Sequence, residues 1–474
     1  MGLSHEEYSC HWGFVVLAGK FCHWAIMTGL LKSFSIFIPH LVELMGTSYA
    51  VIGLVCTGSH KKAFQIYCIP APLGAFILKR VTARKLGVFG ALLCSSGMIG
   101  AAFCTRVLHL GVCMATLGLG NVFLVITITT NLHQHFLAKF DVINTISLIG
   151  SPTGAFITPV ITENLLEIYG LAGTILILGG LSLNLVVCAL VLRPPRRKKR
   201  WKKGENDIEY MRVQKPDNAA DKREAVEDGV NSVHDLSSKS NTNDIKTKQR
   251  TTSWIDYIFD ITNLSVLRRT PSFVLLLLPN LLMMVVWMGW TLFLVPHAES
   301  LGISQSRAAY LAMLGGIGGI TGLVCTSIFL VFYPQVALKL PAATSLIGAF
   351  VFFLDLASSH YVFQAIHAFL IGVLIYHTSV YISVGVKYAL PDEDFTMGFG
   401  LALFFYAIGT ITGGMGSGLI YDLTQDYKLV FVAFGLAEVL ISLCYIGFVI
   451  VQSCQRKKKE DLTLNGSKHL EYKL

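Results

Sequence analysis

The chain has 474 residues, of which 53% are hydrophobic and only 14% are charged. Its mean hydropathy of +0.59 lies well above that of soluble domains. This composition excludes a soluble globular domain and predicts a membrane protein. The net charge of +9 does not indicate a nucleic-acid partner, because the basic residues cluster beside hydrophobic runs, where they set membrane topology.

About twelve apolar runs are long enough to cross a bilayer as helices, and short polar breaks separate them. The sequence therefore predicts an all-α, polytopic membrane protein. We expect spans that begin near Gly13, Tyr49, Leu86, Val107, Val142, Leu171, Ser272, Arg307, Val336, His360, Phe395 and Leu429.

A polar stretch divides these spans into two sets of six. We expect an N-terminal half over residues 1–192, a largely disordered loop over 193–271, a C-terminal half over 272–451 and a tail over 452–474. Basic residues near span ends place the loop and both termini in the cytoplasm. The residues on that side are Lys79, Arg80, Arg84, Lys85, Lys139, the Arg193–Lys203 cluster, Lys339, Lys387 and the Arg456–Lys459 run.

Two six-span halves joined by a long cytoplasmic loop are typical of the major facilitator superfamily, in which rigid halves rock about a site near the membrane midplane. Glycines four residues apart, such as Gly150 and Gly154 or Gly409 and Gly413, favour close helix packing. This glycine pattern is generic, because packing without transport explains it equally well.

Three sequence motifs point to one family within this superfamily. SCHWGF enters the first span, HFLAKFDVINTISLIGSPTG enters the fifth, and GLIYDLTQDY follows the eleventh. With these motifs the chain resembles the monocarboxylate transporter family over nearly its whole length, apart from the central loop and tails. It departs from the family pattern at Ser9, which replaces an acid, and at Ala138 and Phe140, which stand at basic positions.

The resemblance implies a secondary transporter of small organic anions in the plasma membrane. It also permits a single-span glycoprotein partner, which some relatives need to reach the surface. No cofactor or metal is expected, and the sequence contains no clustered metal ligands, phosphate-binding loop or nucleophile elbow that would indicate an enzyme. The 11 cysteines form no CxxC pair, so we interpret them as small buried hydrophobic residues.

Lys32 is the leading candidate for substrate binding. It matches the position at which lactate-carrying relatives place a lysine in the first span. Independently, a charge inside a membrane span is costly unless it faces a polar interior, so it marks a functional site. Thr28 and Ser35 share its helix face, as does Trp24. The alternative is that Lys32 extends to the outer membrane surface.

Three further residues complete the predicted substrate-binding set. Asn144 lies in the second motif, and Tyr376 and His377 lie in the tenth span. His377 is either a titrating group or a hydrogen-bonded structural residue. Lys20 is left out of the set, because it lies only a couple of turns into the first span and is expected to reach the cytoplasmic surface.

Two charges implied by the resemblance are missing. Proton-coupled relatives carry an aspartate and an arginine in the eighth span, and Gly319 and Leu323 occupy those positions here. We therefore expect facilitated transport of a monocarboxylate, or of a related organic anion or zwitterion, without proton coupling. The alternative is a family member that acts as a sensor or interaction protein. The cations His60, Lys61 and Lys62 interrupt the second span as an apparent insertion.

Overall fold

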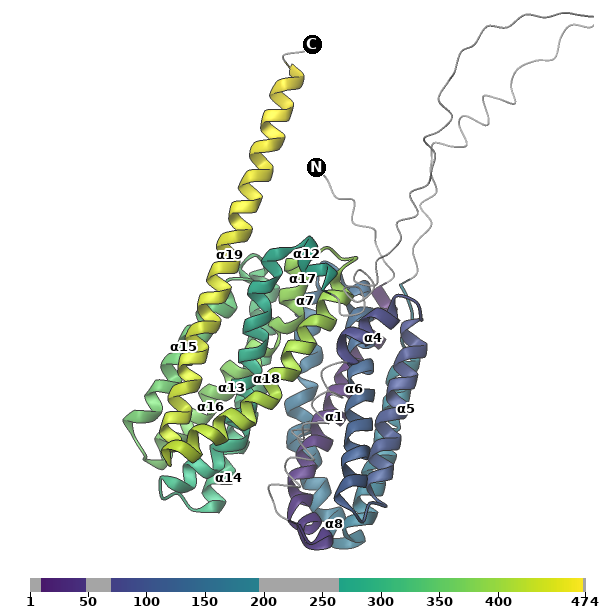
Figure 1. Ribbon diagram of the computed structural model, residues 1–474, viewed down its shortest axis with the longest axis vertical. Coiled ribbons are helices and arrows are strands. Elements are labelled where there is room, and N and C mark those ends of the chain that lie inside the picture. Colours follow the sequence, from purple (N-terminus) through teal and green to yellow (C-terminus); the bar gives the residue numbers. More distant parts are fainter. Residues whose placement is uncertain (1–9, 48–69, 196–263, 472–474) are drawn as a thin grey trace, which may run out of the picture.

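The structure is a computed structural model that describes residues 10–47, 70–195 and 264–471, and every regular element in this part of the chain is a helix (Figure 1). The insertion at His60–Lys62 and most of the central loop lie outside the described residues.

The first group of helices comes from the N-terminal part of the chain. Within it α5 packs along α6, and α1 packs along α8. The elements are α1 (Cys10–Met45), α4 (Pro70–Leu78), α5 (Ala83–Ala101), α6 (Val107–His135), α7 (Phe140–Leu148), α8 (Gly150–Ser182) and α9 (Asn184–Leu190).

The second group comes from the C-terminal part. Its main contacts join α14 to α16, α13 to α18 and α15 to α19. The elements are α12 (Ser265–Arg269), η1 (Pro271–Phe273), α13 (Val274–Ser300), α14 (Gln305–Phe332), η2 (Pro334–Val336), α15 (Leu340–Leu354), η3 (Asp355–Ala357), α16 (Tyr361–Ser379), α17 (Tyr381–Ala389), α18 (Phe395–Thr424) and α19 (Tyr427–Glu471).

The described helices match the predicted spans in order and position. Nine helical segments of the described chain are long and apolar enough to cross a membrane. One of them covers residues 140–190, and it breaks at Gly170, whose φ of 64° only glycine adopts readily. Division there yields the predicted fifth and sixth spans, and α5 supplies the third. Of the second span, only α4 is described.

Glycines let helices within each group approach closely. A side chain at Gly154 would overlap the carbonyl oxygen of Ala25, and one at Gly150 would overlap that of Phe21, so α8 lies directly on the α1 backbone. The second group has an equivalent contact, where Gly409 of α18 meets the carbonyl of Leu281 in α13. These contacts make each group a tightly packed unit.

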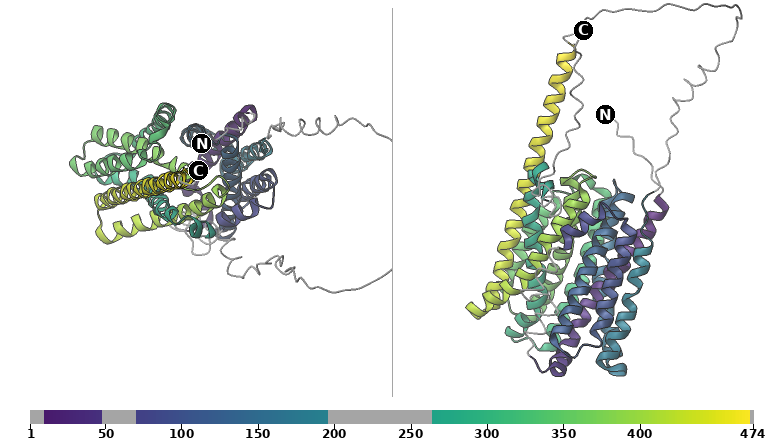
Figure 2. Two further views of the ribbon diagram at one scale, coloured as in Figure 1. Left: turned by 90° about the horizontal axis from the view of Figure 1, so that it is seen from above. Right: turned by 45° about the vertical axis from the view of Figure 1, so that its right-hand side comes forward.

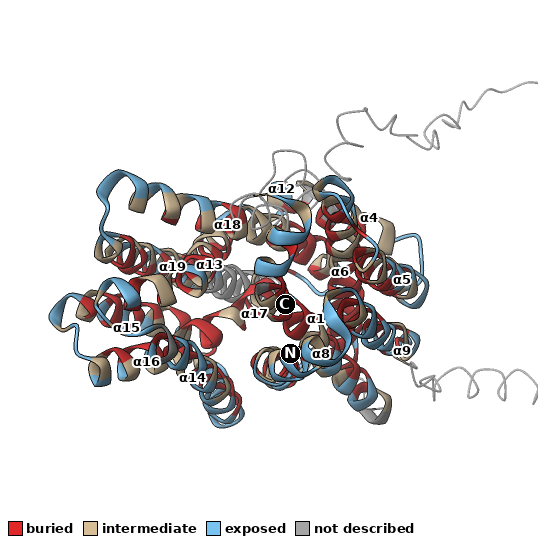
Figure 3. Ribbon diagram, turned by 90° about the horizontal axis from the view of Figure 1, so that it is seen from below, coloured by how far each residue is buried: buried red, intermediate tan, exposed pale blue. Residues whose placement is uncertain are grey.

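The helices turn apolar side chains outward as well as inward. Figure 3 shows buried residues on the faces that helices turn toward one another and exposed residues around the perimeter. Large exposed hydrophobic residues such as Phe156, Leu183 and Ile366 are what a surface in contact with lipid requires.

The two ends of the bundle differ. At the end that we call the terminal face, α1 begins beside the end of α9: the Trp12 indole donates a hydrogen bond to the Val191 carbonyl at 2.8 Å, and the Arg193 guanidinium lies over the Trp12 ring. The C-terminal end of α19 projects from the same end (Figure 2). We call the other end, where α5 ends and α6 begins, the opposite face.

Candidate functional site

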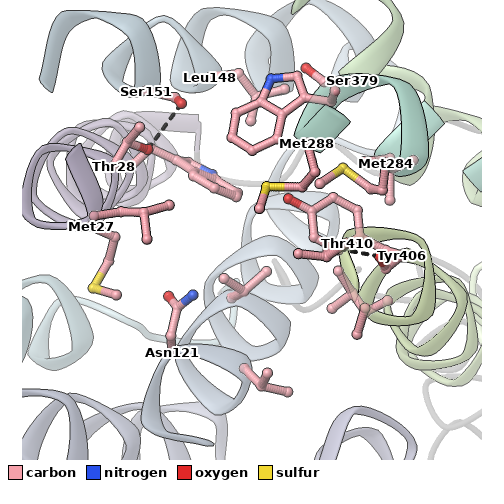
Figure 4. A pocket seen from close by; sticks show the side chains of 18 of the residues that line it. Met27, Thr28, Asn121, Leu148, Ser151, Met284, Met288, Ser379, Tyr406 and Thr410 are labelled. Carbon is pink, nitrogen blue, oxygen red and sulfur yellow. Dashed lines mark hydrogen bonds between the residues drawn. The ribbon is translucent and has the colours of Figure 1, made fainter. Parts of the chain in front are cut away.

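A cavity of about 320 Å³ lies between the two groups of helices. Its walls come from α1, α6, α7 and α8 on one side and from α13, α16, α17 and α18 on the other (Figure 4). It extends toward the opposite face as far as Phe34 and Met114 and toward the terminal face as far as Thr129 and Ser383. Because residues from both groups line it, a movement of one group against the other would reshape the site.

Lys20 is the one charged residue among the described residues that line this cavity. Its side chain is only 2% exposed, and its Nζ donates a 2.5 Å hydrogen bond to Oδ1 of Asn144 on α7. The expectation that Lys20 reaches the cytoplasmic surface was therefore wrong. It lies about 15 Å along α1 from the first described residue, too deep for its stem to reach water.

Two more hydrogen-bond donors accompany the ammonium group. Lysine only donates, so the amide oxygen of Asn144 must face Lys20, and the amide nitrogen points elsewhere. That nitrogen and the indole nitrogen of Trp24 are both buried, and neither has a hydrogen-bond partner among the described residues. Trp24 lies one helical turn from Lys20 on the same face of α1. Buried donors without partners are costly, so an acceptor that reached them would stabilise the site.

No carboxylate among the described residues of the cavity wall balances the Lys20 charge. The undescribed segment 48–69 contains no aspartate or glutamate in its sequence either. Asp141 lies one turn before Asn144 on α7, but it forms a 2.7 Å ion pair with Lys387. A buried cation without a counter-charge costs several kcal/mol, and a negatively charged ligand would offset that cost.

The rest of the cavity wall is mainly apolar. Trp287 and a cluster of methionines line it from α13, and Met27 lines it from α1. Figure 4 shows Met284 and Met288 beside each other, with Met27 on the other side of the cavity. Methionine is flexible and polarisable, so it accommodates ligands of different shapes. The methionines that line the cavity are Met27, Met114, Met283, Met284 and Met288.

Three of the six predicted site residues line the cavity: Thr28, Asn144 and Tyr376. The Thr28 hydroxyl forms a 3.0 Å hydrogen bond with that of Ser151 on α8 (Figure 4). Lys32 is half-buried on α1 and is not one of the described lining residues. The side chain of Ser35 lies outside the described part of the chain.

His377 is directed toward α14 and is also not among the described lining residues. Its Nδ1 forms a 2.5 Å hydrogen bond with the hydroxyl of Thr326, and the oxygen of that hydroxyl lies 2.6 Å from the Gly322 carbonyl oxygen. The hydroxyl has one proton, which it donates either to Nδ1 or to the Gly322 carbonyl. In the second case Nδ1 donates to the hydroxyl oxygen. This buried contact between α14 and α16 agrees with the structural interpretation of His377.

The position of the missing aspartate is filled by an aromatic ring. A side chain at Gly319 would overlap the ring of Tyr376, and Leu323 is fully buried in the apolar core. The chain thus has a phenol from α16 where the proton-coupled pattern would place charges from α14. The uncharged Gly319 therefore packs against the Tyr376 ring.

Polar contacts join the two groups at the terminal face. Asp141 of α7 accepts hydrogen bonds from Lys387 at 2.7 Å and from the Tyr388 hydroxyl at 2.6 Å. His133 of α6 stacks on the Phe395 ring with centroids 3.8 Å apart, and its Nε2 lies 3.3 Å from Asp392. We call these contacts the terminal latch. They join the two groups between the cavity and the terminal face.

Sequence reasoning missed Lys20, although a signal was present. Lys20, Trp24 and Thr28 are spaced four residues apart and therefore share one helix face. The sequence analysis placed Trp24 and Thr28 on the helix face of Lys32. It did not extend that face by one more turn to Lys20. The deciding fact, that α7 and α9 enclose this part of α1, involves residues more than a hundred positions away.

The comparisons with known proteins agree with this geometry. The model of the Major Facilitator Superfamily matches residues 16–386. The chain belongs to this superfamily. Its members are transporters rather than enzymes, and the fold predicted from the sequence is confirmed.

The curated relatives include monocarboxylate transporters. The chain is 23% identical to monocarboxylate transporter 2 of Homo sapiens, over 97% of this chain and 92% of the relative. It is 25% identical to monocarboxylate transporter 12-B of Danio rerio, over 95% and 90% of the two chains. These relatives agree with the resemblance seen in the motifs.

Solved structures share the fold. FucP in the outward conformation superposes with a TM-score of 0.64 at 15% identity, covering 92% of this chain and 98% of FucP. The proton:xylose symporter XylE gives 0.63 at 11% identity, covering 93% and 97%.

Gly319→Leu should destabilise the protein, because the new side chain displaces the Tyr376 ring. Overpacking of this kind costs about 1–3 kcal/mol, so the purified protein should unfold at a lower temperature. Gly316→Leu on the same helix is the control, since nothing lies within 4 Å of a side chain there. Tyr376→Ala should restore much of the loss in the Gly319→Leu background. Equal melting temperatures for the two glycine variants would contradict the overlap.

Proposed function

We propose that the protein carries monocarboxylates, or related organic anions with an apolar body, across the membrane by alternating access. The observation that carries this proposal is the group of three buried donors, Lys20, Asn144 and Trp24, in a cavity shared by both helix groups. A charge-assisted hydrogen bond from an ammonium to a carboxylate is among the stronger polar contacts. The ligand would supply the counter-charge that the described wall lacks.

The apolar wall supports a ligand with a hydrophobic body. A carboxylate bound at Lys20 would direct the remainder of the molecule toward Trp287 and the methionines of α13. Binding would therefore bring the two helix groups together around one molecule, with its charge on the first group and its body on the second. A zwitterion is the less favoured substrate, because the described wall offers its ammonium no carboxylate.

The short helix α7 would couple the site to the terminal latch. Asn144 contacts Lys20, and Asp141, one turn earlier, holds Lys387 and Tyr388. A ligand that draws Lys20 or Asn144 toward itself would shift α7 and with it the latch carboxylate. Opening toward the terminal face requires these contacts to break. Their number and geometry therefore set part of the free-energy barrier to opening.

Transport is proposed to be facilitative. Gly319 and Leu323 carry no titratable group, and the Tyr376 phenol fills the space beside Gly319. Lys32 is proposed as a second cation that meets the anion nearer the opposite face, with Ser35 on the same helix. His377 remains a proposed member of the set only through its neighbour Tyr376, since its own hydrogen bond goes to Thr326.

The protein is proposed to lie in the plasma membrane with both termini in the cytoplasm. The basic residues Arg80, Arg84 and Lys339 near helix ends at the terminal face support this orientation. A single-span glycoprotein partner is proposed from the resemblance to monocarboxylate transporters alone.

Lys20→Gln should lower transport of monoanionic carboxylates. The amide keeps a donor toward Asn144 but loses the charge, and a hydrogen bond to a charged group contributes about 1.5–3 kcal/mol. We expect kcat/KM to fall about 10- to 100-fold in cells supplied with a panel of labelled carboxylates. Lys428→Gln near the opposite face is the matched control. Lys32→Gln in the same panel tests the second cation.

The panel also tests the alternative of a protein that does not transport. Surface labelling must show equal amounts of each variant. Wild-type protein at the surface that moves no member of the panel would exclude the proposed function and favour a sensor or interaction protein.

Transport should respond little to external pH. Between about pH 6 and about pH 7.5 the substrate stays ionised, because carboxyl groups titrate near pH 4. Without a proton-binding group in α14, initial uptake rates should agree within about twofold over this range. Substrate should also fail to accumulate against its gradient when an inward proton gradient is imposed. Steep activation by acid would overturn the facilitative assignment while leaving the anion site intact.

Asp141→Asn should loosen the terminal latch. Loss of the ion pair with Lys387 costs about 1–3 kcal/mol, which favours opening toward the terminal face by about 5- to 150-fold. A cysteine introduced as Ser383→Cys should then react faster with maleimide added to the terminal side of inverted vesicles. Arg269→Gln breaks a 2.7 Å ion pair with Asp394 inside the second group and serves as the control. An unchanged labelling rate in Asp141→Asn would rule out the latch.

A further inference from the structure

Two cysteines meet at the opposite face of the first helix group. Cys104 lies in the connection between α5 and α6, and Cys113 lies in the second turn of α6. Their Sγ atoms are 3.6 Å apart, and both residues are free thiols. The Cys104 thiol also approaches the Gly100 carbonyl at 3.4 Å. The pair belongs neither to the central cavity nor to the terminal latch.

The helix packing holds these thiols together. Near this end α5 and α6 are in close backbone contact, because a side chain at Gly97 would lie 2.6 Å from the Cys113 carbonyl oxygen. One at Gly100 would lie 3.1 Å from the Cys113 Sγ. Gly97 therefore makes room for the Cys113 backbone, and Gly100 makes room for its side chain. The proximity follows from a tightly packed hairpin rather than from a chance meeting of surface loops.

The position of the pair places it in an oxidising compartment if the termini are cytoplasmic. Cys104 and Cys113 lie at the face opposite the basic residues, which is the lumenal side during synthesis and the extracellular side afterwards. Disulfides form and persist in those environments and are rare in the cytosol. The other described cysteines lie deeper in the helices or toward the terminal face.

We propose that Cys104 and Cys113 form a disulfide in the mature protein. The oxidant is an oxidised dithiol oxidoreductase of the secretory pathway. The Cys113 thiolate, the more exposed of the two, attacks its disulfide and forms a mixed disulfide. The Cys104 thiolate then displaces the enzyme's sulfur. The chain loses two electrons and two protons, and the oxidoreductase gains both as its reduced dithiol.

The need for a catalyst follows from the surroundings of Cys104. Burial, together with the neighbouring Cys113 thiol, raises the pKa of Cys104 to about 11. Its thiolate is scarce at neutral pH, so uncatalysed oxidation is slow. Once formed, the bond would join the end of α5 to the start of α6. It lies wholly inside the first group, so it would stiffen that group without crossing the interface that moves.

Peptide mapping of the full-length wild-type protein tests the bond directly. Protein from a eukaryotic host is denatured, treated with N-ethylmaleimide and digested with trypsin, which cuts after Arg106 between the two cysteines. We expect peptides 86–106 and 107–139 to appear as one linked species that separates on reduction. Both peptides fully modified by N-ethylmaleimide before reduction would overturn the proposal.

A matched set of variants assigns the bond to this pair. After the first blocking step, reduction should release two thiols in wild-type protein and in Cys94→Ser, which removes a neighbouring cysteine of α5. It should release none in Cys104→Ser or Cys113→Ser. Release of two thiols from either of the last variants would show that other cysteines are paired. Because labelling follows denaturation, the result does not depend on how well each variant folds.

Discussion

The buried ammonium of Lys20 constrains the arrangement around it. An uncompensated charge at this depth is tolerated only with polar partners and a cavity beside it. Asn144 provides one partner, and the position of α7 fixes that side chain. The Asn144 amide nitrogen and the Trp24 indole are left as buried donors without partners among the described residues. These two donors are therefore costly to keep buried, and an acceptor that reached them would remove part of that cost.

Contacts inside each helix group differ in kind from contacts between the groups. Within the groups, glycines such as Gly154 and Gly409 bring backbones together, and such contacts cannot loosen without unpacking the helices. Between the groups, the latch combines polar contacts of Lys387 and Tyr388 with the buried ring of His133, which stacks on Phe395. Opening would break the polar contacts and expose the stacked rings. The chain therefore combines rigid units with a releasable interface, as rocking of rigid halves requires.

The sequence predicted the fold closely because hydrophobic length and glycine spacing are local signals. It placed the start of nearly every described span within a few residues, including the break at Gly170. It also named Thr28, Asn144 and Tyr376, which line the cavity and whose part in binding stays a prediction. The charged residue of the cavity escaped it, because whether a lysine reaches water depends on the helices that enclose it. The meeting of Cys104 and Cys113 was equally invisible, since it depends on how α5 and α6 pack.

Gly319 and Leu323 of α14 are uncharged, and the Tyr376 ring of α16 packs against Gly319. This difference from proton-coupled relatives bears on substrate selectivity as well as on proton coupling. An aspartate and an arginine would place opposite charges in the second group, and the arginine would offer a bound anion a second cation. With Gly319 and Leu323 in their place, the described cavity has one charged anchor, on the first group. The second group then contributes Trp287, Tyr376 and methionines, whose contacts grow with the apolar area of the ligand. Charge would select the class of substrate, and apolar fit would select within it.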